Sequence, residues 1–405
     1  TPKPSSAASD VYKRQVLGEV PAMAFFLGGL LAWFRAVDAA AVPETRSLGE
    51  TGFLSRFWRG IPRRGWLWLV LAGFLFALSM ITKNQFFILL PTLLLVGLID
   101  RLYYRRLHPL QVIIPVLLGV LGVAAWYLAL PHLAPPVVVQ HTVKQWKTAP
   151  ARSILVLSPS LMMRSARFVF GPRVFYGWAL PALVYALLVS LRRDWQGLRE
   201  ATLLAFVSLW LGWYIVLSIG WERYAFPAVM LLGLFVARLF HQLVQGPRLP
   251  FSEVMQRIQR GQAGKELLRL SLGAILVAML LVPLVQQGWA ILAEADASAW
   301  QMADYLNTHV PLDTVIETWE PEMAFLTKHH YHSPPAAVLD AMSRHIALGT
   351  PLPPDLYDFL TAEPEYILVG KFAKWTRLYT DSLSQCCQFV VSFGEYALYR
   401  VKNAE

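Results

Sequence analysis

The sequence predicts a polytopic α-helical membrane protein with a small C-terminal α/β domain. Of its 405 residues, 56% are hydrophobic and 15% are charged, a balance that is too apolar for a soluble protein of this size. The mean hydropathy of +0.45 agrees with that class. Long stretches with few charged residues recur along the chain, and each approaches or reaches the length of a membrane crossing.

The net charge of +10 is explained by the membrane as well. Lysine and arginine residues in short loops orient membrane helices and face anionic lipid headgroups, so we expect membrane lipid as a partner and no nucleic acid. The two cysteines, Cys386 and Cys387, are adjacent. Neighbouring cysteines rarely bridge each other, and the pair lacks the spacing of a metal site. Neither a metal nor another cofactor is expected.

Residues 1–15 differ from the rest of the chain. They begin without methionine, are rich in small polar residues and run directly into an apolar stretch. They resemble translated adapter sequence, and no signal-peptide cleavage pattern ends the apolar stretch that follows. We therefore expect residues 1–15 to be non-native and the native N-terminal part of the protein to be missing.

Eight apolar stretches are predicted to cross the membrane. They comprise residues 16–36, 66–82, 86–99, 109–130, 174–191, 201–219, 225–240 and 267–285. The third is shorter than a bilayer crossing requires, so we expect it to tilt or to rely on flanking residues that reach the interface. Between the fourth and the fifth, residues 153–170 alternate apolar patches with Arg164 and Arg167 and are broken by Pro159. This composition is typical of a helix that lies in the membrane interface.

The positions of the basic residues predict the orientation of these helices. Four alternate loops are all basic, as cytoplasmic loops are, namely residues 37–65, 100–108, 192–199 and 241–265. Loop 131–173 carries six basic residues on the opposite side, but long loops follow the rule weakly. Glu19, Lys83, residues 221–224 and the C-terminal domain then share the extracytoplasmic face of the cell membrane. The predicted domains are a transmembrane domain, residues 16–288, and a soluble extracytoplasmic domain, residues 289–405.

The C-terminal domain is predicted to be a small α/β or α+β unit of roughly a hundred residues, a normal domain size. Residues 314–318, 366–370, 389–392 and 396–401 have the composition of strands, and residues 298–307 that of a helix. Three histidines lie close together, at His329, His330 and His332. Their spacing does not fit a zinc site, so we expect a solvated turn before the next prolines. We also interpret the nearby acidic residues Glu317, Glu320 and Glu322 as a solvated turn.

Five polar residues at the predicted extracytoplasmic helix ends are candidate site residues: Glu19, Lys83, Glu222, Arg223 and Tyr224. Glu19 lies about one turn inside an apolar stretch, where carboxylates are functional by default; the alternative is that it faces water at the headgroups. Lys83 can hold a lipid phosphate as a point charge, or it is an ordinary interfacial lysine. Arg223 can bind a phosphate with two N–H groups, unless it merely pairs with Glu222. Tyr224 can place a hydroxyl against a sugar or a phosphate.

The order of these motifs resembles that of the C-type integral-membrane glycosyltransferases, with the closest likeness to protein O-mannosyltransferases and lipid A aminoarabinose transferases. The matching motifs are Gly18 to Pro21 at the opening of a span, Ile81 to Lys83 at the end of a span, Gly177 to Pro181 after the interfacial segment, and Glu222 to Tyr224 with Pro227 in a late span. The resemblance covers residues 16–288 by arrangement. The C-terminal domain is similar to the variable domain that such enzymes append.

This resemblance implies an enzyme of the GT-C fold that moves a hexose or pentose from a polyprenyl-phosphate donor to a lipid, protein or polysaccharide acceptor outside the membrane. The family's general base is an aspartate in the first extracytoplasmic loop, and no stretch of this chain matches it. We therefore expect that aspartate in the missing N-terminal segment and expect the fragment to be inactive alone. Glu19 would be the second acidic residue of the catalytic site, which positions acceptor or donor. The substrate-binding residues would be Lys83 and Arg223, which offset the phosphate charge, together with Glu222 and Tyr224 at the donor headgroup.

Two alternatives remain beside this interpretation. The first is a non-enzymatic flippase or transporter of lipid-linked sugars, a class in which inverted repeats and helices broken at mid-depth are common. The sequence shows no internal repeat, and its candidate polar residues gather at one face, which favours the enzyme. The second is a transferase similar to the O-antigen ligases, which would use external-loop arginines such as Arg164 and Arg167.

Overall fold

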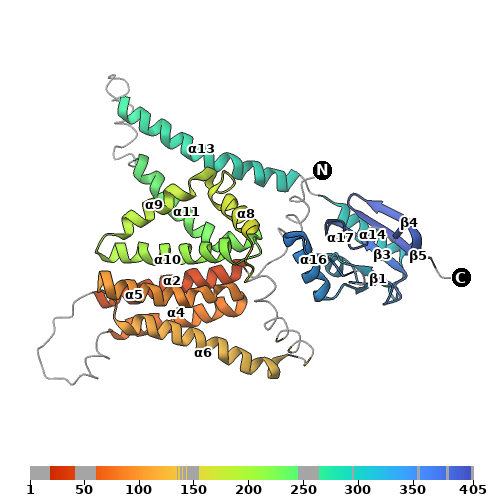
Figure 1. The fold of residues 1–405 in the computed structure, drawn as a ribbon, viewed down its shortest axis with the longest axis horizontal. Coiled ribbons are helices and arrows are strands. Elements are labelled where there is room, and N and C mark those ends of the chain that lie inside the picture. Colours follow the sequence, from red (N-terminus) through yellow and green to blue (C-terminus); the bar gives the residue numbers. More distant parts are fainter. Residues whose placement is uncertain are drawn as a thin grey trace, which may run out of the picture. The chain divides into compact units, whose positions relative to one another are not determined.

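The computed structural model describes residues 19–41, 61–134, 155–244, 264–293, 296–353, 356–379 and 383–402, together with residues 136, 139 and 143. Within these residues the protein is mostly helical, with a small sheet near the C-terminus (Figure 1). Contacts between residues divide the chain into a helical unit, Val16–Val282, and a C-terminal unit that contains Pro283–Glu405. The predicted non-native segment, residues 1–15, lies outside the described residues.

Apolar helices make up most of the helical unit. In chain order the elements are α2 (Glu19–Ala41), α4 (Arg63–Thr82), η1 (Asn84–Ile88), α5 (Leu89–Ile99), η2 (Asp100–Tyr104), α6 (Pro109–Leu133), α8 (Pro159–Phe170), η4 (Phe175–Gly177), α9 (Ala179–Ser190), α10 (Trp195–Val216), α11 (Glu222–Val244) and α13 (Gly264–Ala293). α13 is one continuous helix that runs through the boundary between the units and also through the predicted boundary after residue 288.

Five helical stretches within the described residues are long and apolar enough to cross a membrane. They are Glu19–Ala39, Arg63–Thr82, Asn84–Tyr104, Pro109–Leu133 and Glu222–Leu243. The predicted count of eight spans is not confirmed. α9 lies at the fifth predicted span, but its 12 residues extend only about 18 Å, against an apolar bilayer core of about 30 Å. The third predicted span is longer than expected, because η1 and η2 continue α5 at both ends.

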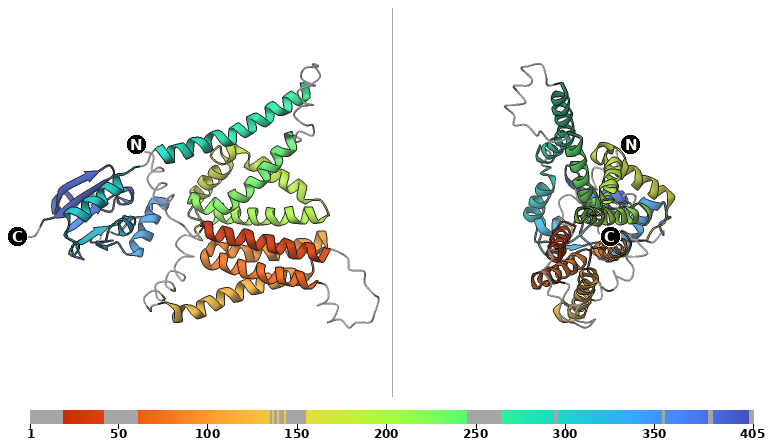
Figure 2. Two further views of the ribbon diagram at one scale, coloured as in Figure 1. Left: turned by 180° about the vertical axis from the view of Figure 1, so that it is seen from behind. Right: turned by 90° about the vertical axis from the view of Figure 1, so that its left-hand side faces the viewer.

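Small residues bring the first helices close together. α2 packs against α4, and α4 packs against α6, and these helices lie side by side in the views of Figures 1 and 2. A Cβ atom on Gly29 would lie 2.4 Å from the ring of Phe76, and one on Gly73 would lie 2.6 Å from the side chain of Leu118. Only glycine fits at these two positions, as is common where membrane helices approach closely.

Ion pairs and hydrogen bonds join the helix ends that were predicted to be cytoplasmic. Asp38 near the end of α2 pairs with Arg199 near the start of α10, and Arg238 of α11 pairs with Glu200 of α10. The hydroxyl of Tyr104 donates to the carbonyl oxygen of Ser190 at the end of α9. Through these contacts the ends of α2, η2, α9 and α11 lie close to the start of α10. Glu19 and Lys83 lie at the other ends of their helices.

The predicted interfacial segment contains a helix that is shorter than expected. α8 starts at Pro159, which stands in its first turn, and ends at Phe170. Pro159 therefore opens the helix instead of breaking it, because proline is well suited to the first helical turn, where its missing N–H is not needed. Residues 153–154 of the predicted segment lie outside the described residues. α8 packs against α10 and α11.

The C-terminal unit is built around a five-stranded mixed sheet. Its elements are α14 (Ser298–His309), β1 (Val315–Thr318), α15 (Met323–Leu326), β2 (His330–His332), α16 (Ala336–Leu348), β3 (Tyr366–Val369), α17 (Lys371–Thr376), α18 (Leu383–Cys386), β4 (Cys387–Phe393) and β5 (Tyr396–Val401). The strand order is β2-β1-β3-β5-β4, with β1, β2 and β3 parallel and β5 antiparallel to both of its neighbours.

The sheet confirms the four predicted strands and corrects two other predictions. The histidine segment is not a turn: it forms β2, which pairs with β1 so that His332 lies opposite Glu317. The acidic segment is not solvated either, because Glu317 and Glu320 are buried. Each face of the sheet carries an apolar core, with Ile316 on the face of α14 and Ile367 on the face of α17 and α18. The two glutamates are thus held in a domain interior, where a carboxylate requires partners.

Candidate functional site

Glu19 and Lys83 form an ion pair at one end of the helical unit. Glu19 lies in the first turn of α2, and α4 ends at Lys83, whose backbone is extended. Lys83 Nζ lies 2.7 Å from Glu19 Oε1, and the two side chains are 22% and 9% exposed. Glu19 therefore does not face open solvent. Both charges lie in a largely dry environment, where each compensates the desolvation of the other.

A hydrogen bond to the backbone fixes this pair in place. Ser79 Oγ, one turn before the end of α4, donates to the carbonyl oxygen of Ala22 in α2 at 2.8 Å. The N–H of Lys83 in turn donates to the carbonyl oxygen of Ser79 at 3.0 Å. The second carboxylate oxygen, Glu19 Oε2, is buried and has no hydrogen-bond partner within the described residues. Since buried polar atoms normally have partners, this oxygen is suited to accept a hydrogen bond from a ligand.

The other three predicted residues lie in the first turn of α11. Glu222 Oε1 lies 3.1 Å from Arg173 Nη1, so its ion pair is with Arg173 and the alternative of a Glu222–Arg223 pair is wrong. The guanidinium carbon of Arg223 lies 4.4 Å from the ring centroid of Trp221 and 5.3 Å from that of Tyr224. These cation–π contacts hold the arginine over two aromatic faces. Tyr224 itself is buried, so its ring serves packing first.

Aromatic side chains connect the ion pair to this turn. Phe86 of η1, three residues after Lys83, packs edge-on against Trp210 of α10 with ring centroids 4.9 Å apart. Trp210 Nε1 donates to the carbonyl oxygen of Tyr224 at 2.6 Å. The Glu19–Lys83 pair and the turn therefore belong to the same end of the helical unit. The sequence predicted this shared end from charge alternation alone.

A pocket of about 580 Å³ opens beside the turn. Its lining comes from α8 and the residues just after it, from α10, and from the start of α11 with the glycine before it. These residues are Ser160, Met163, Arg164, Arg167, Phe168, Pro172, Arg173, Tyr214, Gly220 and Glu222. Of the predicted site residues only Glu222 lines it. Three guanidinium groups and one carboxylate give the lining an excess of positive charge, which favours an anionic ligand.

Sequence reasoning missed Arg173 and therefore missed the pocket. Arg164 and Arg167 lie three positions apart, a spacing that places both on one face of a helix and could have indicated a shared surface. Arg173 follows the end of α8, where no periodicity marks its direction. Its position depends on how the chain turns back towards α11.

Comparison with known proteins adds no identification. No protein-family model matches the chain, and a search of curated proteins finds no match. Within the residues that the structure describes, no group of three or more histidine, cysteine, aspartate or glutamate side chains could hold a metal ion.

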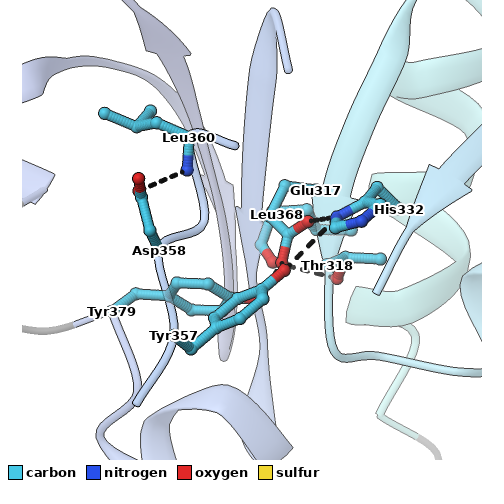
Figure 3. Close-up of polar contacts among 8 residues, drawn as sticks. All are labelled: Glu317, Thr318, His332, Tyr357, Asp358, Leu360, Leu368 and Tyr379. Atoms are coloured by element: carbon cyan, nitrogen blue, oxygen red, sulfur yellow. Dashed lines mark hydrogen bonds and ion pairs between the residues drawn. The ribbon is translucent and has the colours of Figure 1, made fainter. Parts of the chain in front are cut away.

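The C-terminal unit contains a second polar constellation, centred on Glu317 of β1 (Figure 3). Glu317 Oε1 accepts hydrogen bonds from the hydroxyls of Tyr357 at 2.7 Å and Tyr379 at 2.8 Å, and Oε2 lies 2.5 Å from His332 Nδ1. Burial, reinforced by the carboxylate of Glu317, raises the pKa of both tyrosines, so both remain donors. Three partners thus satisfy a carboxylate in the interior of the domain.

Glu320 lies just beyond the end of β1 and caps α17. Its carboxylate accepts hydrogen bonds from the backbone N–H groups of Gly370, Phe372 and Ala373 at 2.8–3.2 Å. Burial, followed by the charge of Glu322, raises the pKa of Glu320 to about 7, against the opposing effect of these three donors. A Cβ atom on Gly370 would lie 2.6 Å from the Glu320 side chain, so glycine is needed at that position.

Proposed function

We propose that the protein transfers a sugar from a polyprenyl-phosphate donor to an acceptor on the extracytoplasmic side of the cell membrane. The observation that carries the proposal is the largely buried Glu19–Lys83 ion pair, in which the ammonium is fixed and one carboxylate oxygen has no hydrogen-bond partner among the residues that the structure describes. A transferase of this kind needs a fixed cation for the donor phosphate and an acceptor group for a substrate hydroxyl. The predicted side of the C-terminal unit, also extracytoplasmic, is part of the proposal.

The chemistry assigns separate work to the two residues. The acceptor oxygen forms a bond to the anomeric carbon, the bond from that carbon to the phosphate oxygen breaks, and polyprenyl phosphate leaves with the electron pair. Lys83 stabilises the charge that grows on the leaving phosphate, where a preorganised cation contributes most. Glu19 Oε2 orients the acceptor hydroxyl. The proton of that hydroxyl passes to the general base, which is an aspartate in the enzymes that the chain resembles.

The test uses the full-length protein in membranes and a radiolabelled polyprenyl-phosphate sugar. Glu19→Gln and Lys83→Met are expected to lower donor consumption at least about 100-fold, the usual cost of losing a charge-stabilising group at a reaction centre. Asp38→Asn is the matched control, because it removes a carboxylate from an ion pair at the opposite end of α2.

Membrane insertion of all three variants is measured in parallel by accessibility of an introduced tag. Wild-type donor consumption in both Glu19→Gln and Lys83→Met contradicts the site assignment. A protein that moves the labelled donor between leaflets without consuming it is a flippase, and that result overturns the transferase proposal itself.

A further inference from the structure

We infer that the arginine-lined pocket beside α8 is a binding site for a phosphate monoester carried on an apolar chain. The pocket contains neither Glu19 nor Lys83, and of the residues expected at the donor headgroup only Glu222 lines it, so the inferred site lies beside the one proposed for the sugar donor and goes beyond it. Its volume of about 580 Å³ falls within the range of small-molecule sites, about 300–1,000 Å³.

One wall of the pocket, formed by Gly220 and Arg164, is ordered without a ligand. Gly220 has a φ of +73°, and a Cβ atom there would lie 2.9 Å from Ser165 Oγ and 3.4 Å from Arg164 Nη2. The backbone can approach α8 this closely because the residue is glycine. Arg164 Nη2 donates to the carbonyl oxygen of Ile219 at 3.4 Å, which holds the guanidinium against the wall. Binding would therefore require little rearrangement of the wall that α8 provides.

The charge of the lining matches a monoester better than a diester. Three guanidinium groups and the single carboxylate of Glu222 leave an excess of two positive charges. A phosphate monoester carries about −1.5 to −2 at neutral pH, whereas a phosphodiester carries one negative charge. Guanidinium groups also match phosphate geometry, because each can donate two parallel N–H bonds.

Two of the arginines are available to such a ligand. The side chain of Arg167 makes no ion pair or hydrogen bond within the part of the chain that the structure describes. Arg173 pairs with Glu222, but the two side chains are 65% and 59% exposed. Exposed ion pairs contribute only about 0–1 kcal/mol, so a phosphate can displace Glu222 from Arg173 at little cost.

The apolar part of the lining points to an amphiphile rather than to free phosphate. Met163, Phe168 and Pro172 share the pocket with the arginines. α8 is a short amphipathic helix of the kind found at membrane interfaces. Met163 and Phe168 lie on the same face as the two arginines, because they stand three or four positions from them. A lipid whose headgroup lies at that depth would present its phosphate to the arginines and its chain to these apolar side chains.

The test uses the chain in phosphatidylcholine nanodiscs and titrates farnesyl phosphate, its methyl diester, farnesol and inorganic phosphate. Farnesyl phosphate is expected to bind at least about tenfold more tightly than each of the other three, which corresponds to one additional charge-assisted hydrogen bond. Equal affinity for the diester refutes the monoester assignment. Equal affinity for inorganic phosphate refutes the apolar part of the site.

Three variants locate the binding. Arg167→Ala is expected to weaken farnesyl phosphate binding about tenfold, since it removes one charge-assisted contact. Arg192→Ala is the matched control, because Arg192 is exposed and pairs with Asp194 at the opposite helix ends. Glu222→Gln is expected to strengthen binding, because it releases Arg173 and removes the only carboxylate of the lining. A gain of affinity cannot come from misfolding, so weaker binding in Glu222→Gln or unchanged binding in Arg167→Ala overturns the inference.

The two proposals fail separately. Binding of farnesyl phosphate involves no sugar transfer, so a negative result here leaves the donor site at Glu19 and Lys83 standing. Loss of transfer in Glu19→Gln, conversely, leaves the affinity of this pocket unchanged.

Discussion

Removal of a single hydroxyl from the Glu317 constellation is expected to destabilise the C-terminal unit strongly. Tyr379→Phe deletes a donor that lies 2.8 Å from Glu317 Oε1, on a side chain that is 1% exposed. Hydrogen bonds to charged groups contribute about 1.5–3 kcal/mol, and water cannot replace a donor at a site this buried. We therefore expect the free energy of unfolding to fall by about 1.5–3 kcal/mol. Tyr357→Phe should cost less, because Tyr357 is only partly buried and leaves room for water.

The assay is urea unfolding of residues 296–402, followed by tryptophan fluorescence. This segment contains the whole sheet and both apolar cores, so it is expected to fold alone in a two-state manner. Tyr399→Phe is the matched control, because the Tyr399 hydroxyl makes no hydrogen bond within the described residues while its ring packs against Phe389. A loss below about 0.5 kcal/mol for Tyr379→Phe, or equal losses for both variants, would refute the reasoning, since surface-like changes fall in that range.

Two further predictions concern pH and helix packing. The pKa of Glu320 is raised above its unfolded value, so its contribution to stability is complete below pH 4.5 and is lost as the pH rises through about 7. The free energy of unfolding of the same segment should therefore fall by at most about 1.4 kcal/mol per pH unit across that window. Glu320→Gln should flatten that dependence, and an unchanged pH profile in the variant would contradict the assignment. Gly29→Ala should lower the melting temperature of the detergent-solubilised chain, because the new methyl group collides with Phe76. Gly212→Ala should leave the melting temperature unchanged, because a methyl group at that position would meet no atom within 4 Å. Equal melting temperatures of the two variants would contradict that packing.

The helical framework was predictable because the bilayer imposes a requirement that is visible in the sequence. A run of apolar residues long enough to cross it must form a helix, since no other backbone conformation satisfies its own hydrogen bonds there. The count was less predictable. α9 is apolar throughout but too short to cross alone, and η1 and η2 extend α5 with residues that are not uniformly apolar.

The candidate site was predictable residue by residue but not as an arrangement. Glu19, Lys83 and Glu222 stand out because charges beside apolar stretches are costly. Their partners depend on tertiary packing: Lys83 meets Glu19 only because α2 and α4 are adjacent, and Glu222 meets Arg173 across the segment that follows α8. No local pattern contains that information.

The buried glutamates of the C-terminal unit show the same limit. Acidic residues after a strand are normally solvated, so Glu317 was predicted to be exposed. Its burial depends on Tyr357 and Tyr379, which lie 40 and 62 positions further along the chain. β2 was missed because its three residues are too few for an alternating pattern, and it exists through its pairing with β1.

The Glu320 carboxylate occupies a position of the C-terminal sheet where other proteins bind an anion. In open α/β sheets, small anions bind beyond the carboxyl ends of parallel strands, where successive connections run to opposite sides of the first strand. The order β2-β1-β3 places that position between β1 and β3, and there the N–H groups of Gly370, Phe372 and Ala373 already hold the Glu320 carboxylate. A phosphate or carboxylate from solution would have to compete with a group tethered a few residues away. The edge at which such sheets bind anionic ligands is therefore occupied in this protein by its own carboxylate, which links the end of β1 to the start of α17.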